Sequence, residues 1–299
     1  MKVRVRVPAS SANLGPGFDS LGLALSLYNE LTLAEADRVT VSIRGEGAAH
    51  LPADPANVVA RAARMVFEAV GRPFPGARIE CVNGIPLSRG LGSSAAAWLG
   101  GLLGANALLG TPLDRSAILS LAARAEGHPD NVAAALCGGL TVSCETDDGV
   151  VAVPLPVPEA IRWVALIPEL TGATAEARAV LPASVPRADA VFNVQRVALL
   201  LASLQAKRVD LLHVAMDDRL HQPYRMRLFP WMAAVAEAAR EAGALGCVLS
   251  GAGPSLLAAV AEDADRVARA MTRALAAAGV PSVARPLDVD TTGAITETS

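Results

Sequence analysis

The sequence Pro86-Leu-Ser-Arg-Gly90-Leu-Gly92-Ser-Ser-Ala95 decides how this chain is interpreted. It lies between a predicted strand, residues 77–82, and an unbroken helical stretch that runs to Leu109. Glycine permits backbone conformations in which consecutive N–H groups converge on one anion. The first turn of a helix adds free N–H donors and the positive end of the helix dipole. With two serine hydroxyls at positions 93 and 94, the stretch predicts a phosphate-binding loop that contains no lysine.

Three other interpretations of this loop stay open at this point. A Walker loop needs Gly-Lys-Ser/Thr, and the only lysines of the chain are Lys2 and Lys207. Residues 90–95 fit a loose GxGxxA dinucleotide fingerprint, and Asp114 lies about twenty residues on, where a ribose-binding acid is expected. Asp114, however, follows a Thr-Pro helix start rather than a strand. The third interpretation is a glycine loop that only turns a strand into a helix.

The composition is that of a chain with a substantial core and balanced charge. Of 299 residues, 52% are hydrophobic and 18% are charged, and the net charge is -3. This gives no basic surface of the kind that binds nucleic acid. No apolar stretch approaches the ~20 residues of a membrane span, and residues 1–11 lack the apolar segment of a signal peptide. We therefore expect a cytoplasmic protein without nucleic-acid or membrane partners.

Strands and helices are mixed without strict alternation, which predicts an α+β fold rather than a doubly wound sheet. Valines at positions 3, 5 and 7 alternate with charged residues as a first strand, which the stretch 10–17 is expected to interrupt. Pro154–Pro158 contains three prolines and predicts a boundary between domains 1–155 and 156–299. Beyond it, a strand at 245–249, a helix at 263–278 and a last strand at 282–287 belong to a split βαβ pattern.

Two further glycine-bearing loops follow predicted strands, and each alone is compatible with an ordinary turn. They are Pro8-Ala-Ser-Ser-Ala-Asn13-Leu-Gly15-Pro-Gly17-Phe-Asp19 and Leu249-Ser-Gly251-Ala-Gly253-Pro-Ser255. Together with Pro86–Ala95, they resemble the three motifs of the GHMP kinase superfamily, whose Pro-x-x-x-Gly-Leu-Gly-Ser-Ser-Ala loop is matched at every fixed position. Within that superfamily the sequence is most similar to the homoserine kinases, through Val7–Gly22, Glu126–Val132 and His221–Arg225.

The resemblance implies the two-domain GHMP kinase fold. Its N-terminal domain is like the second domain of ribosomal protein S5 and binds ATP, and its ferredoxin-like C-terminal domain completes the substrate site. The implied reaction moves the γ-phosphate of ATP onto the hydroxyl of L-homoserine, with Mg²⁺, in threonine biosynthesis, and relatives suggest a homodimer. The alternatives are a kinase of a mevalonate-like substrate, a dinucleotide-binding oxidoreductase, and a non-catalytic relative that binds a metabolite.

The resemblance also implies nucleotide and metal ligands. Ser94 and Glu126 occupy the family's metal-ligand positions, although only Gly127 separates Glu126 from His128, where several homoserine kinases have a longer loop. Without the resemblance, Glu126 reads as a solvated carboxylate at a helix end. The implied ATP contacts are Pro86, Ser88, Arg89, Gly90, Leu91, Gly92, Ser93, Ser94 and Ala95, with Asn57, Thr174, Gly251 and Gly253 near the nucleotide.

Homoserine is a zwitterion, so its pocket needs both signs of charge. A planar guanidinium holds a carboxylate with two parallel hydrogen bonds, which an ammonium cannot do. Arg178 and Arg225 match the family's carboxylate-binding arginines, although Arg178 alone reads as a helix-surface residue. Asp19 suits the substrate ammonium. The positions that match hydrogen-bonding partners of the amino acid or its hydroxyl are Asn13, His128 and Asn131.

The general base is the open part of the mechanism. Asp130 corresponds to the catalytic aspartate of the mevalonate kinase branch, whereas homoserine kinases are thought to act without a dedicated base. A loose, metaphosphate-like transition state makes early proton removal dispensable. We expect Asn131 to orient the hydroxyl, and we expect the other histidines, His50, His213 and His221, to be surface or structural residues.

Overall fold

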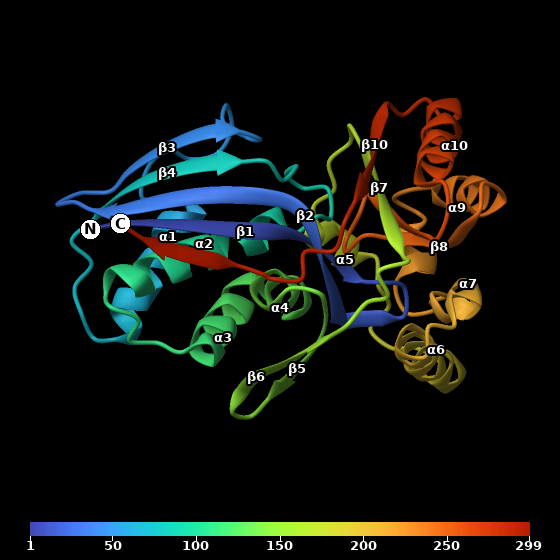
Figure 1. Cartoon of the computed structure of the whole chain (residues 1–299), viewed down its shortest axis with the longest axis horizontal. Helices are drawn as coiled ribbons and strands as arrows, with labels where there is room; N and C mark the ends of the chain where they lie inside the picture. The colour runs from blue at the N-terminus through green and yellow to red at the C-terminus, as the bar shows by residue number, and fades with distance from the viewer.

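The computed structural model describes residues 1–299, which form two β-sheets with associated helices (Figure 1). The larger sheet has seven strands in the order β11-β1-β2-β4-β3, and β5 pairs with β2 and with β6. These strands are β1 (Lys2–Asn13), β2 (Gly17–Glu35), β3 (Thr40–Gly45), β4 (Ala77–Asn83), β5 (Leu140–Thr146), β6 (Gly149–Leu155) and β11 (Ile295–Thr298).

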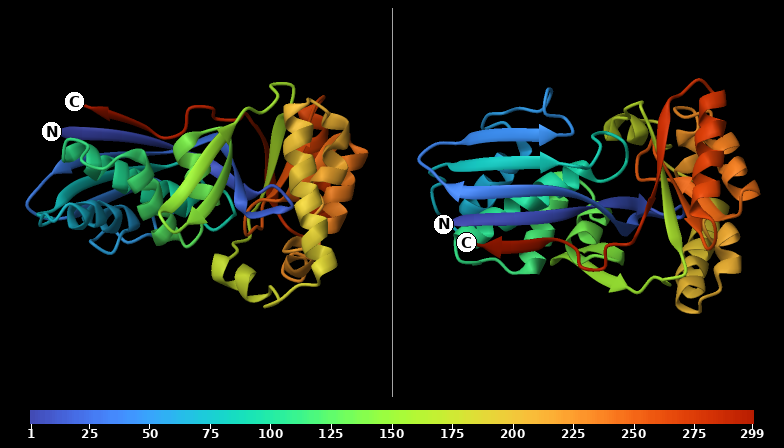
Figure 2. Two further views of the ribbon diagram at one scale, coloured as in Figure 1. Left: turned by 90° about the horizontal axis from the view of Figure 1, so that it is seen from below. Right: turned by 45° about the horizontal axis from the view of Figure 1, so that its top comes forward.

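The alternating valines of β1 lie on the buried face of this sheet. Val3, Val5 and Val7 are each at most 1% exposed, whereas Arg4 between them is exposed. This period of two is that of a strand with one buried face. Four helices lie on the buried side, as the two views in Figure 2 show. They are α1 (Val58–Ala69), α2 (Ser93–Leu108), α3 (Arg115–Glu126) and α4 (Asp130–Cys137).

The second sheet has four antiparallel strands in the order β10-β7-β9-β8. Its strands are β7 (Arg162–Pro168), β8 (Ala244–Leu249), β9 (Leu256–Val260) and β10 (Ser282–Leu287). Two helices, α9 (Met232–Glu241) and α10 (Ala264–Ala277), pack against it and enclose a core of their own. The segment between β7 and α9 contains α5 (Thr174–Ala179), α6 (Arg187–Gln205), η1 (Val209–Leu211), α7 (Leu212–Ala215) and α8 (Gln222–Arg225). This is the predicted ferredoxin-like arrangement.

Two sequence predictions about strands are wrong. The strand at 282–287 is not the last one, because β11 returns to the larger sheet and pairs with β1, so that the two termini lie side by side (Figure 1). The segment 291–298 is short and polar, and its pairing partner is almost the whole chain away. The first strand is also not interrupted at residue 10, since β1 continues to Asn13 through a bulge beside Pro8. The boundary at residues 155/156 stays a prediction.

None of the helices combines the length and the apolar character that crossing a lipid bilayer requires.

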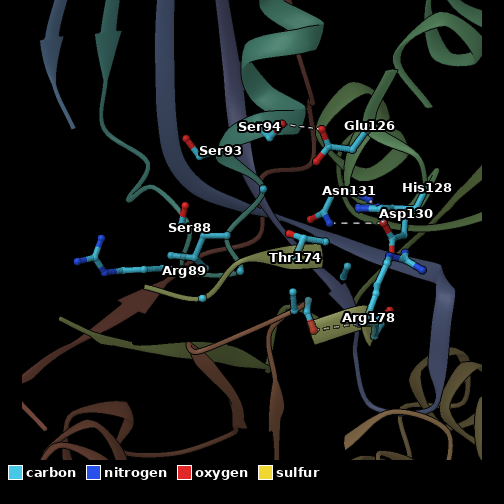
Figure 3. A pocket seen from close by; sticks show the side chains of 18 of the residues that line it. Ser88, Arg89, Ser93, Ser94, Glu126, His128, Asp130, Asn131, Thr174 and Arg178 are labelled. Carbon is cyan, nitrogen blue, oxygen red and sulfur yellow. Dashed lines mark hydrogen bonds and ion pairs between the residues drawn. The ribbon is translucent and has the colours of Figure 1, made fainter. Parts of the chain in front are cut away.

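The candidate functional region lies where loops from both sheets meet. The β4–α2 loop, the α3–α4 junction, the turn after β1 and the β8–β9 loop all face one polar cavity. Figure 3 shows this region from close by.

Candidate active site

The loop between β4 and α2 has the backbone of an anion-binding nest. Ser88, Gly90 and Gly92 have φ of 52°, 73° and 70°, and the residues between them have negative φ. Alternation of this kind brings successive N–H groups to the same side of the chain. Gly92 is also the N-cap of α2 and has no side chain to cap it, so the first-turn N–H groups are available to a ligand.

All four carbonyl groups of residues 88–91 accept hydrogen bonds from other segments. The pairs are Gly172 N to Ser88 O (2.8 Å), Ser255 N to Arg89 O (3.3 Å), Ser250 Oγ to Gly90 O (2.6 Å) and Ser10 N to Leu91 O (3.1 Å). Because the carbonyl oxygens are engaged in this way, the loop leaves its N–H groups for an anion. Three of the four donors come from the part of the chain beyond residue 155.

The β8–β9 loop holds the other two motifs together. Gly251 N donates to Ala12 O at 3.2 Å, and Gly251 O accepts from Asn13 Nδ2 at 3.2 Å. The same carbonyl accepts from Arg225 Nη1 at 2.9 Å. A Cβ atom at Gly90 would overlap Ser250 O. The contacts of this loop are therefore mainly to the other loops, and they fix the shape of the cavity.

A hydroxyl and a carboxylate meet beside the start of α2. Ser94 Oγ donates to Glu126 Oε2 at 2.7 Å, and Figure 3 shows the two side chains facing each other. Burial raises the pKa of Glu126, the charge of Asp130 raises it further, and the Ser94 hydrogen bond and the charge of His128 only partly oppose this. Two oxygen donors next to a phosphate-binding loop are the ligands that Mg²⁺ takes from proteins.

A buried polar network follows at the start of α4. Asp130 Oδ1 lies 2.7 Å from His128 Nδ1 and accepts from Asn131 N at 2.6 Å. Ser10 Oγ donates to Asn131 Oδ1 at 2.9 Å. Burial by itself would lower the pKa of His128, but the hydrogen bond and charge of Asp130, together with the charge of Glu126, raise it overall. His128 and Asp130 therefore form an ion pair when the histidine is protonated.

Opposite charges line the other end of the cavity. Arg178 Nη1 and Nη2 donate to the two carboxylate oxygens of Asp19 at 3.0 and 2.7 Å. The side chains are 37% and 33% exposed, so a ligand can reach both. Arg225 is nearly buried, and its guanidinium carbon lies 5.4 Å from the centre of the Phe18 ring. Burial and the charge of Arg178 lower the pKa of Arg225 to about 10, which leaves it charged at neutral pH.

These groups surround one cavity of about 140 Å³ whose walls are mainly polar. Most of the residues proposed from the sequence line it. They are Asn13, Asp19, Pro86, Ser88, Arg89, Gly90, Leu91, Gly92, Ser93, Ser94, Glu126, His128, Asp130, Asn131, Thr174, Arg178, Arg225 and Gly251. A concave site with convergent charged groups is the expected form of a small-molecule site.

Three proposed residues do not line the cavity. Asn57 is the N-cap of α1, where its Oδ1 accepts from Val59 N at 2.9 Å and its Nδ2 donates to Pro52 O at 2.8 Å. Ala95 is fully buried within α2, and Gly253 N is bonded to Ser250 O. The adenine contact expected of Asn57 is therefore not supported, because both ends of its amide are already hydrogen-bonded within the protein.

Arg89 lines the cavity, but its guanidinium is occupied elsewhere. Its Nε donates to Pro168 O at 2.7 Å, and its terminal nitrogens donate to Leu87 O at 3.2 Å and Glu169 O at 3.3 Å. In Figure 3 the side chain is directed away from Arg178 and Asp130. Arg89 therefore connects the phosphate loop to β7 instead of supplying a cation to the cavity.

Sequence reasoning missed the residues that support the site from behind. Ser10 and Ser250 are fully buried and bind the phosphate loop, and Gly172 N does so from the segment before α5. His221, expected at the surface or in a structural role, is fully buried beside Arg225. Its spacing of four residues from Arg225, which would place both on one side of a helical turn, is the signal that was available.

The dinucleotide interpretation of the loop required Asp114 as a ribose-binding acid. Asp114 is the N-cap of α3, and its Oδ1 accepts from Ala117 N at 2.8 Å. Both sheets are antiparallel except for the β3–β4 pair. Neither feature belongs to a doubly wound dinucleotide-binding domain.

Comparison with known proteins identifies the family. The model of the GHMP kinases N terminal domain matches residues 57–139, and that of the GHMP kinases C terminal matches residues 200–277. The chain is 47% identical to the homoserine kinase of Moorella thermoacetica, over 97% of this chain and 98% of that protein. It is 44% identical to the homoserine kinase of Trichormus variabilis, over 98% of both.

Solved structures agree with this assignment. The crystal structure of homoserine kinase from Cytophaga hutchinsonii superimposes with a TM-score of 0.89 at 31% identity, covering 99% of this chain and 97% of the other. Mevalonate kinase of L. major has a TM-score of 0.67 at 15% identity, covering 94% and 95%, which is a likeness of fold alone. The matched domains, the near-complete relatives and the shared fold together show that this chain belongs to the homoserine kinases of the GHMP kinase family.

Proposed function

We propose that this chain transfers the γ-phosphoryl group of ATP to the side-chain hydroxyl of L-homoserine and forms O-phospho-L-homoserine, in threonine biosynthesis. The observation that carries the proposal is the pairing of Asp19 with Arg178 at one end of a cavity whose other end is the Gly90–Ser94 loop. An α-amino acid presents both an ammonium and a carboxylate. A site that holds both charges fits it better than it fits an alcohol with a carboxylate alone.

Backbone N–H groups of residues 90–94 bind the phosphates of ATP in this proposal. Ser94 Oγ and Glu126 Oε2, 2.7 Å apart, are the candidate ligands of Mg²⁺. When bound, the ion neutralises charge on the phosphate oxygens. Protonation of Glu126 removes a ligand, and burial raises its pKa, so activity should decline on the acid side. Thr174 borders the same space, at the first residue of α5.

The substrate amino acid exchanges partners with the Asp19–Arg178 pair. Its ammonium replaces Arg178 at Asp19, and its carboxylate receives hydrogen bonds from Arg178 and from Arg225. Asn13 Oδ1 already accepts from Asp19 N at 3.0 Å, so Asn13 orients the loop that presents this carboxylate. The substrate hydroxyl then extends toward the Asn131 amide and the phosphate loop.

No dedicated base is required in this mechanism. Asp130 Oδ1 accepts hydrogen bonds from His128 and from Asn131 N, and Asp130 is 1% exposed. A carboxylate that is occupied in this way holds its neighbours in place. The proton leaves late, after the phosphoryl group has begun to transfer, because the transition state is loose. Asn131 orients the hydroxyl, and Ser10 holds the Asn131 amide.

The test is a coupled assay of ADP release with Mg·ATP and a panel of alcohols. The panel contains L-homoserine, 4-hydroxybutyrate, which lacks the ammonium, and mevalonate. We expect turnover with L-homoserine, weak turnover with 4-hydroxybutyrate, none with mevalonate, and loss of turnover when EDTA removes the metal. Turnover with mevalonate but not with L-homoserine would contradict the proposal. The homodimer and the cytoplasmic location stay predictions.

A further inference from the structure

His221 bonds to Gly15, 206 residues earlier in the chain, and so joins two distant parts of the site. It precedes α8 and is fully buried, with its ring stacked on Phe18 at 5.3 Å between centres and 25° between planes. Its Nε2 lies 2.8 Å from Gly15 O in the turn after β1. Its Nδ1 lies 3.1 Å from Arg225 Nη1. Through these two contacts the ring links the turn after β1 to Arg225 on α8.

The two partners fix the protonation state of the ring. A carbonyl oxygen only accepts hydrogen bonds, so Nε2 must carry the hydrogen that points to Gly15 O. A guanidinium only donates, so Nδ1 must present a lone pair to Arg225. His221 is therefore neutral, with its proton on Nε2. A second proton, on Nδ1, would face the N–H of Arg225, which is charged at neutral pH.

Most of the N–H groups of Arg225 are used to hold its guanidinium plane. Its Nε donates to Ala177 O at 3.1 Å, and its Nη1 donates to Gly251 O at 2.9 Å and to His221 Nδ1 at 3.1 Å. The remaining nitrogen, Nη2, makes no hydrogen bond within the protein, and Arg225 lines the cavity. Its two hydrogens are therefore left for a ligand.

We propose that neutral His221 is a positioning residue for substrate binding: its Nδ1 lone pair sets the plane of Arg225, and its Nε2 hydrogen holds the turn that leads to Asp19. The inference rests on the proposed function, because Arg225 is assigned there to the substrate carboxylate. It goes beyond that assignment by making carboxylate binding depend on a residue that does not line the cavity.

The charged groups around the His221 ring shift its pKa. Asp218 Oδ2 lies 3.5 Å from Nε2, but it already accepts from His221 N and Gln222 N. Burial lowers the pKa of His221, the charge of Asp218 opposes this, and Arg225 lowers it further. The charge of Asp19, on β2, raises the pKa of His221, as the charge of Asp218 does. Because its pKa is lowered, His221 gains its second proton only at a pH below the ordinary titration range of histidine. Homoserine binding should weaken at that low pH.

Two substitutions separate the two ring nitrogens. In His221→Asn the amide oxygen can take the place of Nδ1 and accept from Arg225, while the bond to Gly15 O is lost. In His221→Gln the amide nitrogen can take the place of Nε2 and donate to Gly15 O, while Arg225 loses its acceptor. We expect the glutamine variant to raise KM for homoserine about tenfold, in the range of one hydrogen bond to a charged group. The asparagine variant should raise it less, and KM for ATP should stay within about twofold in both.

A matched control is available on the surface. His213 is exposed, and its Nδ1 lies 2.8 Å from Asp210 O. His213→Asn and His213→Gln should leave both KM values unchanged. Equal losses for homoserine and ATP in both His221 variants, in step with lower melting temperatures, would overturn the proposal in favour of a merely structural role.

A measurement on the unmodified protein does not depend on either variant folding. In the 299-residue chain with ¹⁵N-labelled histidine, the ring nitrogens of His221 should show the neutral Nε2–H form at pH 7. An imidazolium or the Nδ1–H form would overturn the proposal even if homoserine is the substrate. Conversely, absence of homoserine turnover by the unmodified protein would contradict the proposed function while the ring measurement still stands.

Discussion

The two ends of the cavity bind negative charge by different means. At the nucleotide end, residues 88–94 offer backbone N–H groups, and their only nearby arginine, Arg89, is bonded to carbonyl oxygens of other segments. At the substrate end, the donors are the side chains of Arg178 and Arg225, with Asp19 beside them. The one guanidinium at the first end is bonded to carbonyl oxygens of the protein, whereas the second end has two guanidinium groups that a ligand can reach.

This difference determines what each end tolerates. The nucleotide end depends on backbone conformation, which is fixed by four carbonyl hydrogen bonds and by glycines that leave no room for a Cβ atom. Side chains there that neither bind the metal nor hold the loop can change as long as the backbone does not. The substrate end depends on the identity of a few side chains, because only a guanidinium offers two parallel donors. Substitutions at the two ends should therefore impair the protein in different ways.

The largest effect should come from Gly90→Ala. The added Cβ atom would overlap Ser250 O, and φ at this position is 73°, so the loop must leave its observed conformation. Loss of preorganised N–H donors at a charge-stabilising site costs roughly 10²–10³-fold per donor. We expect kcat/KM to fall at least about 10³-fold and ATP affinity, measured by calorimetry, to be lost.

Gly110→Ala is the matched control for this substitution. Gly110 has φ of 80°, but no atom lies within 4 Å of its missing Cβ, and it follows α2 at the end opposite the loop. We expect a loss of stability of about 1 kcal/mol from backbone strain and unchanged kinetics. If the two variants lose activity equally, the comparison between a backbone-made and a side-chain-made end fails.

Arg178→Lys should have the next largest effect, at the substrate end. An ammonium cannot reproduce the two hydrogen bonds that Nη1 and Nη2 now make to Asp19, nor a bidentate contact with the substrate carboxylate. We expect KM for homoserine to rise roughly 10–100-fold, corresponding to the 1.5–3 kcal/mol of a hydrogen bond to a charged group. KM for ATP should change little, and steady-state kinetics with each substrate varied in turn measures both.

Arg219→Lys provides the control for Arg178→Lys. Arg219 also forms an ion pair, with Asp189 at 3.2 Å, but its side chain is 51% exposed and does not line the cavity. Exposed pairs contribute about 0–1 kcal/mol, so stability and both KM values should barely change. A matching rise in KM for homoserine in this variant would show that the effect of Arg178→Lys is not specific to the site.

Asp130→Asn sharpens the comparison where the two ends meet. The amide oxygen can still accept from Asn131 N, so the start of α4 should keep its geometry. If Asp130 only holds His128 and Asn131, kcat should fall by about tenfold or less, the effect of weakening one hydrogen bond. A fall of several orders of magnitude with unchanged substrate affinity would instead identify Asp130 as a true base.

The sequence predicted the phosphate loop itself better than the residues that hold it in place, for a physical reason. This nest needs positive φ at alternate residues before a helix, which favours glycine, so Gly90 and Gly92 are visible as a local pattern. The chain order also showed a βαβ unit in the second half. In contrast, Ser10 and Ser250 lie in the other two glycine-bearing loops, 81 and 160 residues from Leu91 and Gly90, and no local pattern shows that they bond to the phosphate loop. The same holds for β11, which is defined by its pairing with β1 rather than by its own four residues.

Asn57 and His221 show why the role of a single residue is hard to assign from sequence. An asparagine before a helix is as much a cap as a ligand, and only the bond to Val59 N decides between them. A lone histidine is ambiguous until its partners are known, and those of His221 lie on the turn after β1 and on α8. The sequence indicates which residue types a site needs, whereas long-range packing determines which residues of each type take part in it.

The smallest effect concerns the pH dependence of stability through His128. Its pKa is raised in the folded protein, because the bond and charge of Asp130, with the charge of Glu126, outweigh burial. A group with a raised folded pKa stabilises the fold fully below its unfolded pKa, and this contribution is lost as pH rises through the folded value. The loss in unfolding free energy caused by His128→Asn should therefore be larger at pH 5.5 than at pH 9, as denaturant titrations at both values would measure. In an Asp130→Asn background the difference between the two pH values should shrink, because the carboxylate that favours the imidazolium is gone; an unchanged difference would mean that the pair does not control this histidine.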